Sequence, residues 1–177
     1  MTHAAHFYNA MPVVYKEHEF KVPGTVESVY ALQDMTVEVI ADGIHVPPVM
    51  LHVVYQIKGV ENTALITDSL AYAACSGSVS SEPRVILEDG VCKLADHSAL
   101  AGSIATMDTL IRTCVQKAEI PMIDVFRMAS ETPAKIMGVF DRKGSIEEGK
   151  DADIMMFDHD LNLTYVMQMG NEVTNEL

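Results

Sequence analysis

The sequence is poor in basic residues, in aromatic residues and in cysteine. Its 177 residues include 12 Lys and Arg against 25 Asp and Glu, which gives a formal net charge of -13 at pH 7. Binding to nucleic-acid phosphates requires clustered Lys and Arg, so this deficit argues against non-specific binding to nucleic acid. A small anionic ligand is still compatible with the composition, where a few cationic side chains or backbone N–H groups converge.

The three cysteines, Cys75, Cys92 and Cys114, are odd in number and match no spacing typical of a disulfide framework or of a metal site. We therefore expect reduced thiols in a cytoplasmic protein. The first residues lack the basic and apolar segments of a secretory signal peptide. No apolar run approaches the roughly 20 residues that cross a bilayer, so we expect no membrane association.

Apolar residues make up 49% of the chain, which is enough for a hydrophobic core. Short β-rich segments alternate with helical patterns as far as residue 139, and only β patterns follow. The elements that we expect are, in chain order, a long loop at 12–24, a short helix after Pro23-Gly24, a strand at 36–40, a helix at 47–58, a strand at 63–67, a hairpin at 84–94, a helix at 104–118, helices at 121–130 and 132–139, a strand at 153–157 and a hairpin at 163–174. This alternation predicts an α/β fold of parallel βα units with a small β appendage.

Three of the expected strands end at a residue suited to chemistry. The first ends near His6, the second at Asp42 with His45 just beyond, and the third at Asp68. In a barrel of βα units the C-terminal ends of the strands converge on one site, so we expect these side chains to lie together. In the functional interpretation, Asp68 accepts a proton from a metal-bound water and passes it to a leaving amine. Imidazole is the commonest metal ligand, so His6 is a candidate metal ligand.

Each of these residues also has an ordinary structural interpretation. His6 fits a surface or core histidine, residues 42–45 fit a turn with a solvated ring, and Asp68 fits the cap of the next helix. Leu100-Ala101-Gly102-Ser103 likewise fits an ordinary loop, although its N–H groups precede a helix and are suited to hold an anion or a carbonyl oxygen. The residues alone leave both interpretations open.

Four segments, taken in order, carry a family resemblance. They are Ala5-His6-Phe7-Tyr8-Asn9-Ala10-Met11, Ile40-Ala41-Asp42-Gly43-Ile44-His45, Leu65-Ile66-Thr67-Asp68, and Leu100-Ala101-Gly102-Ser103 with Thr106-Met107. Together they resemble the N-acetylglucosamine-6-phosphate deacetylases of the amidohydrolase superfamily, and residues 144–153 are similar to that superfamily's return from barrel to β-sandwich. The resemblance covers essentially the whole chain. It implies the C-terminal part of a (β/α)8 metal-dependent hydrolase barrel at residues 1-142, and a few strands of a small β-sandwich at 143-177.

The resemblance also implies a role for each matching residue. His6 matches a metal ligand, His45 a substrate-contacting histidine, and Asp68 the catalytic carboxylate that activates the water and later protonates the departing amine. The residues that match substrate-holding or substrate-lining positions are Asn9, Ala10, Leu100, Ala101 and Gly102. The implied reaction hydrolyses the acetamide of an amino-sugar phosphate, N-acetylglucosamine 6-phosphate, to glucosamine 6-phosphate and acetate. The implied cofactor is a divalent metal ion, with zinc as the first choice.

One departure from the family concerns the phosphate. The family has Arg-Glu-Pro-Gly soon after Asn-Ala-Met, and the Arg helps to bind phosphate. Here the chain reads Lys21-Val22-Pro23-Gly24 after a longer loop. Lys21 offers a point charge but no bidentate fork, so the anion site is altered or lost.

The other departure concerns the missing part of the family pattern. The first barrel strands, one portion of the β-sandwich and the other metal ligands of the family precede the segments matched here. One histidine does not make a zinc site, which needs about three protein ligands. We therefore expect activity only after completion by the missing N-terminal half. The expected partners are a complementary N-terminal chain or further copies of this chain in a homo-oligomer. The alternatives are an inactive truncated remnant and a related amidohydrolase that acts on another N-acetyl amino sugar.

Overall fold

A three-stranded parallel sheet forms the centre of the structure, a computed structural model that describes residues 2–71, 73, 84–88 and 90–173. Its strands are β1 (His3–Ala4), β4 (Thr36–Ile40) and β5 (Thr63–Ile66), and β4 lies between the other two. Both pairings are parallel. The predicted strands at 36–40 and 63–67 and their parallel arrangement are thus confirmed.

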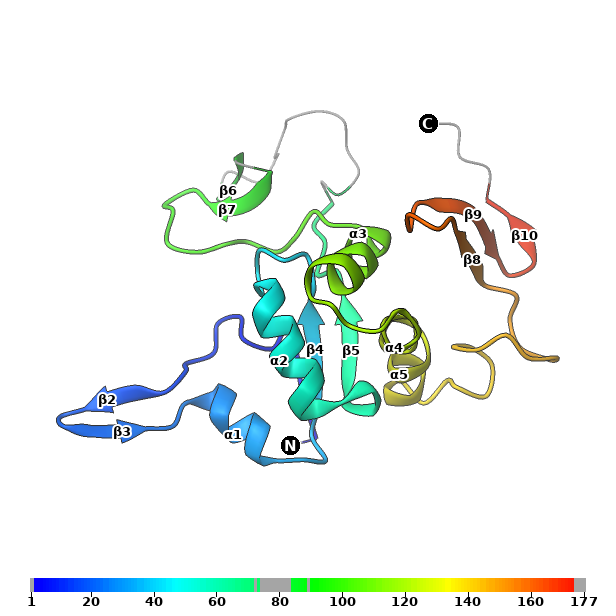
Figure 1. Cartoon of the computed structure of the whole chain (residues 1–177). Helices are drawn as coiled ribbons and strands as arrows, with labels where there is room; N and C mark the ends of the chain where they lie inside the picture. The colour runs from blue at the N-terminus through cyan, green and yellow to red at the C-terminus, as the bar shows by residue number, and fades with distance from the viewer. Residues whose placement is uncertain (1, 72, 74–83, 89, 174–177) are drawn as a thin grey trace.

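Helix α2 (Pro48–Lys58) packs on this sheet, and Figure 1 shows it in front of β4. A proline in the first turn suits a helix start because its φ angle is already helical. The helix buries Leu51 and Val54 and ends at Gly59, whose φ of +71° is a conformation that glycine adopts readily. Its start and its end agree with the prediction.

Lys58, the last residue of α2, is buried although it is charged. Its side-chain ammonium group donates hydrogen bonds to three backbone carbonyls at the end of α1 (Thr25–Ala31), those of Val29 (3.4 Å), Leu32 (2.8 Å) and Gln33 (3.3 Å). The last carbonyls of a helix have no partner within the helix and carry partial negative charge, so a cation there is favourable. Lys58 therefore ties α1 to α2. The helix predicted after Pro23-Gly24 is α1.

The remaining helices follow β5 or lead into it. They are η1 (Val60–Asn62), α3 (Met107–Arg112), α4 (Met122–Ala129) and α5 (Glu131–Ile136). Helix α3 continues as a π-helical turn, η2 (Thr113–Lys117), in which the N–H of Ala118 donates to the carbonyl of Thr113 at 3.0 Å. The predicted helix at 104–118 begins only at Met107, because the residue before it is extended.

Two antiparallel units complete the described chain. β6 (Val85–Glu88) and β7 (Val91–Leu94) form the predicted hairpin, of which Asp89 lies outside the described residues. β8 (Ile154–Phe157), β9 (Leu163–Gln168) and β10 (Asn171–Glu172) form a sheet in the order β10-β9-β8. The predicted β appendage is therefore present. The boundary between residues 142 and 143 stays a prediction.

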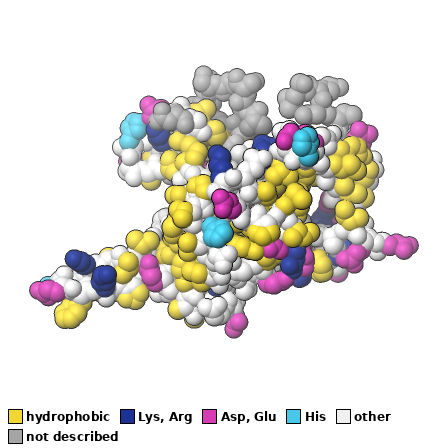
Figure 2. Space-filling view, viewed as in Figure 1, with side chains coloured by type: hydrophobic (Ala, Val, Ile, Leu, Met, Phe, Trp, Pro, Cys, Tyr) yellow, Lys and Arg dark blue, Asp and Glu magenta, His cyan; other side chains and the backbone are white. Residues whose placement is uncertain are grey.

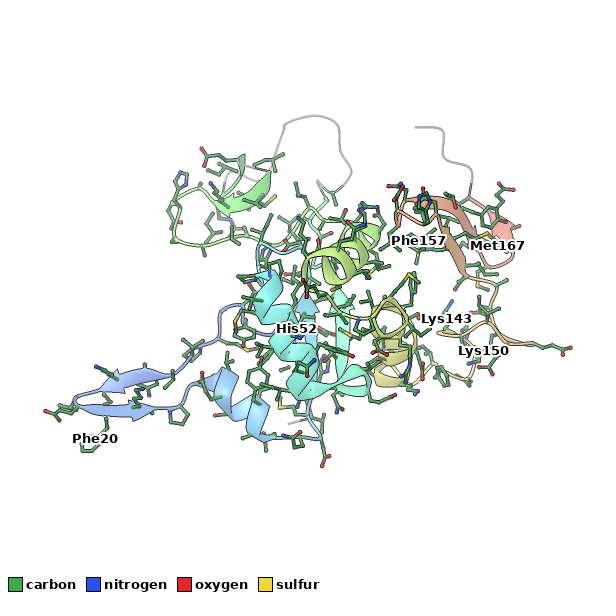
Figure 3. All side chains as sticks on the ribbon, viewed as in Figure 1. Phe20, His52, Lys143, Lys150, Phe157 and Met167 are labelled. Atoms are coloured by element: carbon green, nitrogen blue, oxygen red, sulfur yellow. The ribbon has the colours of Figure 1, made fainter. Side chains whose placement is uncertain are left out.

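The prediction of a long loop at 12–24 is wrong. This segment contains a hairpin, β2 (Tyr15–Glu17) and β3 (Phe20–Val22), which projects from the body of the molecule in Figure 1. Charged side chains lie near its tip in Figure 2, and Phe20, labelled in Figure 3, is 74% exposed. The sequence pattern did not predict this hairpin. Almost all of the hairpin residues are exposed, so no alternation of buried and exposed positions marks its strands.

The described cysteines are Cys92 and Cys114, which are buried and form no disulfide, while Cys75 lies outside the described residues. Within the described chain, no helix is long and apolar enough to cross a membrane.

Candidate active site

Three of the predicted site positions follow the three parallel strands. Because β1, β4 and β5 run in parallel, their C-terminal ends share one edge of the sheet. His6 comes just after β1, the Asp42 turn just after β4, and Asp68 just after β5. The structure therefore brings the three strand ends to one edge, as the sequence predicts.

Several residues at this edge have left-handed backbone conformations although they are not glycine. The φ angles are +34° at His6, +54° at Ala10 and +46° at Asp68. An L-residue adopts such angles at a cost of about 1–2 kcal/mol, so the surrounding structure must hold it there. Positive φ angles at non-glycine residues also occur away from this edge, at His18, His97, Glu119, Leu161 and Met169, so they accompany the candidate site but do not by themselves identify it.

Asp42 and His45 form a buried pair at the end of β4. Nδ1 of His45 lies 2.7 Å from Oδ2 of Asp42, and the two side chains are 4% and 6% exposed, respectively. A carboxylate oxygen only accepts, so Nδ1 is the donor. Oδ1 of Asp42 accepts the backbone N–H groups of Ile44 at 2.8 Å and of His45 at 2.9 Å. Both carboxylate oxygens are thus engaged by one turn of chain.

The surroundings of Asp42 act on its pKa in opposite directions. Burial raises the pKa, whereas hydrogen bonds from the His45 ring and from the backbone N–H groups of Ile44 and His45 lower it. The pKa is lowered overall, so this carboxyl group is ionised at neutral pH. The other ring nitrogen of His45, Nε2, is buried and has no hydrogen-bond partner among the described residues. A buried polar atom left without a partner points to a role beyond folding.

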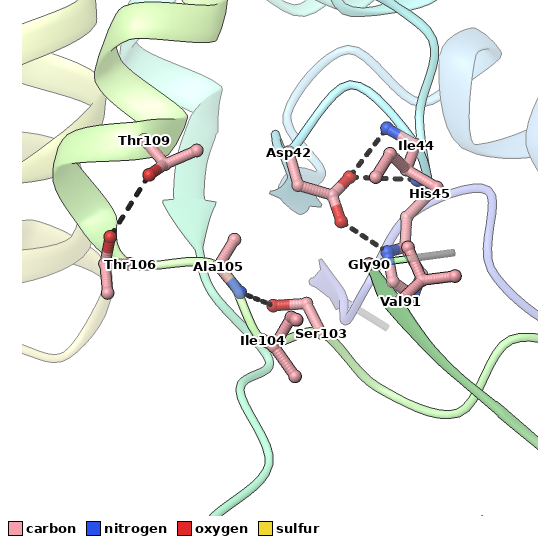
Figure 4. Close-up of a pocket in the computed structure, with 10 residues that line it drawn as sticks. All are labelled: Asp42, Ile44, His45, Gly90, Val91, Ser103, Ile104, Ala105, Thr106 and Thr109. Atoms are coloured by element: carbon pink, nitrogen blue, oxygen red, sulfur yellow. Dashed lines mark hydrogen bonds and ion pairs between the residues drawn. The ribbon is translucent and has the colours of Figure 1, made fainter. Parts of the chain in front are cut away.

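Asp42 and His45 line a cavity of about 330 Å³, drawn in Figure 4. The other lining residues come from the turn after β4, from the β6–β7 hairpin and from the start of α3, and they are Ile44, Gly90, Val91, Ser103, Ile104, Ala105, Thr106 and Thr109. A cavity of this size is suited to a small molecule. Asp42 was expected at this edge of the sheet, and Ile44, Ser103 and Thr106 belong to the segments that carry the resemblance, but none of the four was given a role. The remaining lining residues were not predicted, because distant segments meet here only in the fold.

The loop at 100–103 lies against the chain that follows β5. The N–H of Ser103 donates to the carbonyl of Asp68 at 2.8 Å, and the N–H of Leu70 donates to the carbonyl of Ser103 at 2.8 Å. Gly102 has a φ of +59°, and a Cβ atom there would lie 3.1 Å from the Asp68 carbonyl oxygen. The loop that holds Leu100, Ala101 and Gly102 is therefore fixed to the backbone of Asp68.

His6 and Asn9 form a short turn after β1. The N–H of Asn9 donates to the carbonyl of His6 at 2.8 Å, and Nδ1 of His6 lies 3.2 Å from the carbonyl oxygen of Asn9. Because a carbonyl oxygen only accepts, Nδ1 carries the proton, and the lone pair of Nε2 is left for a ligand. This is the form in which a histidine binds a metal. No group of three or more His, Cys, Asp or Glu side chains suited to a metal occurs in the described part of the chain, so His6 does not make a metal site with its described neighbours.

Lys21 lies apart from these residues. It belongs to β3 of the hairpin that projects in Figure 1. There it is exposed and pairs in register with Lys16 of β2. The hairpin extends away from the sheet. Within this chain, Lys21 is therefore not brought together with His45 and Asp68.

Comparison with known proteins gives a consistent result. A model of the amidohydrolase family matches residues 1–173. N-acetylglucosamine-6-phosphate deacetylase of Bacillus subtilis is 33% identical over 172 residues, a match that covers 96% of this chain and 42% of that protein. N-acetylgalactosamine-6-phosphate deacetylase of a Shewanella species is 28% identical over 169 residues, which cover 93% of this chain and 41% of the relative.

A solved structure supports the same likeness. The Mycobacterium smegmatis N-acetyl-D-glucosamine-6-phosphate deacetylase, a mutant in complex with N-acetyl-D-glucosamine-6-phosphate, superposes with a TM-score of 0.85 at 31% identity. The superposition covers 98% of this chain and 46% of that one. The fold thus fits part of a barrel hydrolase, and the chain spans less than half the length of the proteins that it matches.

Proposed function

Because this chain belongs to the amidohydrolase family, we propose that it is the C-terminal part of a deacetylase for N-acetylglucosamine 6-phosphate. The products are glucosamine 6-phosphate and acetate. The observation that carries the proposal is the common sheet edge on which Asp68, the Asp42–His45 pair and the loop at 100–103 lie. In this assignment residues 1-142 belong to the barrel and residues 143-177 to the β-sandwich.

Asp68 carries the proton transfers in this proposal. A water molecule adds to the amide carbonyl carbon, and the Asp68 carboxylate takes the proton that the water loses. The C–N bond then breaks, and Asp68 returns the proton to the amine nitrogen, so acetate and the free amino sugar leave. The Asp68 side chain follows β5 directly and its residue is exposed, which leaves it accessible to a substrate.

The other predicted residues hold the substrate in this proposal. Nε2 of His45 makes a hydrogen bond to it, and Asn9, Ala10, Leu100, Ala101 and Gly102 line its position. The buried and unpartnered state of Nε2 supports the role of His45, because a ligand group would satisfy that atom. Lys21 contributes to the phosphate site only if the projecting hairpin reaches a substrate held by another chain.

His6 is the proposed metal ligand of this chain, for a divalent ion with zinc as the first choice. Such a metal polarises the amide carbonyl and makes water acidic enough to react at neutral pH. The described residues offer no complete set of ligands, so the remaining ligands come from outside the described chain in this proposal. The lone pair that His6 keeps at Nε2 supports the role of His6 as a metal ligand.

We also propose that an N-terminal part of the enzyme packs against the described chain. A groove of about 1030 Å³ lies between helices α4 and α5 on one side and strand β8 with its flanking segments on the other, where Figure 2 shows hydrophobic side chains gathered. Its apolar residues include Met122, Phe126, Met137, Met155 and Phe157. Met122, Met137 and Met155 are each about half exposed or more in the free chain, and a partner that covers them would remove this apolar surface from water. The alternative is that a second copy of this chain covers the groove.

The test is an assay of this chain with and without the N-terminal half of the Bacillus subtilis deacetylase, in the presence of zinc. We expect acetate release from N-acetylglucosamine 6-phosphate only from the mixture. Asp68→Asn should lower kcat by roughly a thousandfold, the usual range for loss of a general acid and base. Asp141→Asn, at an exposed position away from the sheet edge, is the control. Turnover by the chain alone would show that it needs no complement.

Two other outcomes correspond to the alternatives. A complex that forms but lacks activity would support an inactive remnant. Preference for another N-acetyl amino sugar is favoured by the Shewanella relative, an N-acetylgalactosamine-6-phosphate deacetylase, and by the position of Lys21. Parallel assays with the gluco and galacto phosphates and with the sugars that lack phosphate distinguish these cases.

A further inference from the structure

We infer that Asp42 is a positioning residue, which fixes the proton of His45 on Nδ1 and thereby keeps Nε2 as the atom that meets the substrate. The consequence for the substrate rests on the function proposed above, whereas the effect on the His45 ring does not. Neither the resemblance nor the sequence pattern assigns a role to Asp42. The inference comes from the contacts of its two carboxylate oxygens.

The first argument is that the two oxygens have different partners. Oδ1 receives the two backbone N–H groups of Ile44 and His45, at 2.8 and 2.9 Å, so the carboxylate cannot rotate without losing them. Oδ2 is left for Nδ1 of His45 at 2.7 Å. A neutral imidazole carries its proton on one nitrogen only, so a proton held at Nδ1 leaves a lone pair on Nε2.

The second argument is the confinement of the turn that carries both side chains. Gly43 has a φ of +81°, and a Cβ atom there would lie 3.1 Å from Cγ2 of Thr113. Thr113 begins the π-helical turn η2, and its residue is buried. Single π turns within helices are frequently found at functional sites. The turn from Asp42 to His45 is thus held from inside by the carboxylate and from outside by Thr113.

The third argument is the state of the far side of the ring. The His45 side chain is 4% exposed and lines the cavity of about 330 Å³, yet its Nε2 has no partner among the described residues. The fold therefore orders this ring completely through Nδ1 and leaves the other nitrogen unused. Such an arrangement is typical of a histidine whose orienting partner is a carboxylate and whose second nitrogen serves a ligand.

Asp42→Asn tests the inference with little change in shape. The amide oxygen of the substituted side chain can still accept the N–H groups of Ile44 and His45, but its NH₂ group then faces Nδ1 of His45. Two donors cannot share a hydrogen bond, so the proton should move from Nδ1 to Nε2. Nitrogen-15 NMR of the labelled chain, above the pH at which the ring is protonated, distinguishes the two forms. Signals of His45 are assigned by their loss in His45→Gln.

We expect Nδ1–H in the wild-type chain, Nε2–H in Asp42→Asn, and no change in Asp34→Asn, an exposed aspartate elsewhere. A wild-type proton on Nε2, or an unchanged tautomer in Asp42→Asn, would overturn the inference. In the reconstituted enzyme, Asp42→Asn should raise KM about tenfold and change kcat less, the size of one misdirected hydrogen bond. A tautomer that inverts while KM stays the same would instead refute substrate contact by His45 and leave the positioning by Asp42 established.

Discussion

At the scale of single residues, Asp42 should make the folded chain sensitive to acid. Its pKa is lower in the folded state than the value of about 3.9 for an unfolded chain. A carboxyl group of this kind contributes stability that is fully present above the unfolded pKa and is lost as the pH falls through the folded pKa. We therefore expect the free energy of unfolding to decrease when the pH is lowered below about 4. Part of this decrease should be absent in Asp42→Asn.

Urea unfolding at a series of pH values measures this effect. The difference in unfolding free energy between wild type and Asp42→Asn should shrink steadily as the pH is lowered from about 5. The control is Asp141→Asn, which removes a carboxylate at an exposed position. Equal pH dependence in wild type and Asp42→Asn would contradict the prediction.

At the scale of elements, the sequence predicts best where local signals and burial agree. Helix α2 begins at the proline pair and ends at Gly59 as predicted, and β4 has the predicted bounds. The β2–β3 hairpin was missed because its turn at His18 has a φ of +54° without a glycine or asparagine to announce it. The late start of α3 and the π turn after it were also missed. This stretch makes hydrogen bonds to distant segments, among them Ser103 Oγ to the Thr67 carbonyl and His52 Nδ1 to the Ala118 carbonyl, and no local pattern contains such contacts.

The loop from β7 to α3 should depend on Gly102 for two separable reasons. A side chain there is strained by the φ of +59°, and its Cβ would also lie 3.1 Å from the Asp68 carbonyl oxygen and 3.0 Å from Cγ of Leu70. Gly90 has a similar φ of +74°, but among the described residues no atom lies within 4 Å of a Cβ placed there. Gly90→Ala therefore measures the strain alone.

We expect Gly90→Ala to lower the free energy of unfolding by about 1 kcal/mol and Gly102→Ala by about 2–4 kcal/mol. Urea unfolding of both variants provides the measurement. In the reconstituted enzyme, Gly102→Ala should also lower activity, since it displaces the backbone of Asp68. Equal losses of stability in the two variants would mean that the contact with Asp68 contributes nothing.

At the scale of the whole molecule, the convergence of the strand ends at one edge of the sheet was predictable, but most of the residues that line the cavity were not. Parallel strands place His6, Asp42 and Asp68 at one edge by topology alone, so the order of strand ends in the sequence was sufficient. The Asp42–His45 pair is local to one turn of chain, but the presence of Ser103 and Thr106 beside it depends on tertiary packing. A complete metal site could not be predicted for a different reason, because the described chain lacks a full set of ligands.

The apolar groove gives a prediction about assembly that does not depend on activity. Met122 and Ile123 are adjacent residues of α4, 51% and 68% exposed, and only Met122 lines the groove. If the N-terminal half packs into the groove, Met122→Lys places an ammonium group against apolar partner atoms, whereas Ile123→Lys places it in water. We expect Met122→Lys to weaken the association with the Bacillus subtilis N-terminal half by at least about tenfold, and Ile123→Lys to leave it within about twofold.

Sedimentation or calorimetric titration of each variant with that half measures the association, and circular dichroism confirms that both variants fold. Because both side chains are substantially exposed, neither lysine should destabilise the free chain by more than about 0.5 kcal/mol. Equal weakening by both variants would place the contact on the whole outer face of α4 rather than in the groove. Self-association of the free chain that Met122→Lys abolishes would instead identify a second copy as the cover, since a lysine in the groove disfavours any apolar partner.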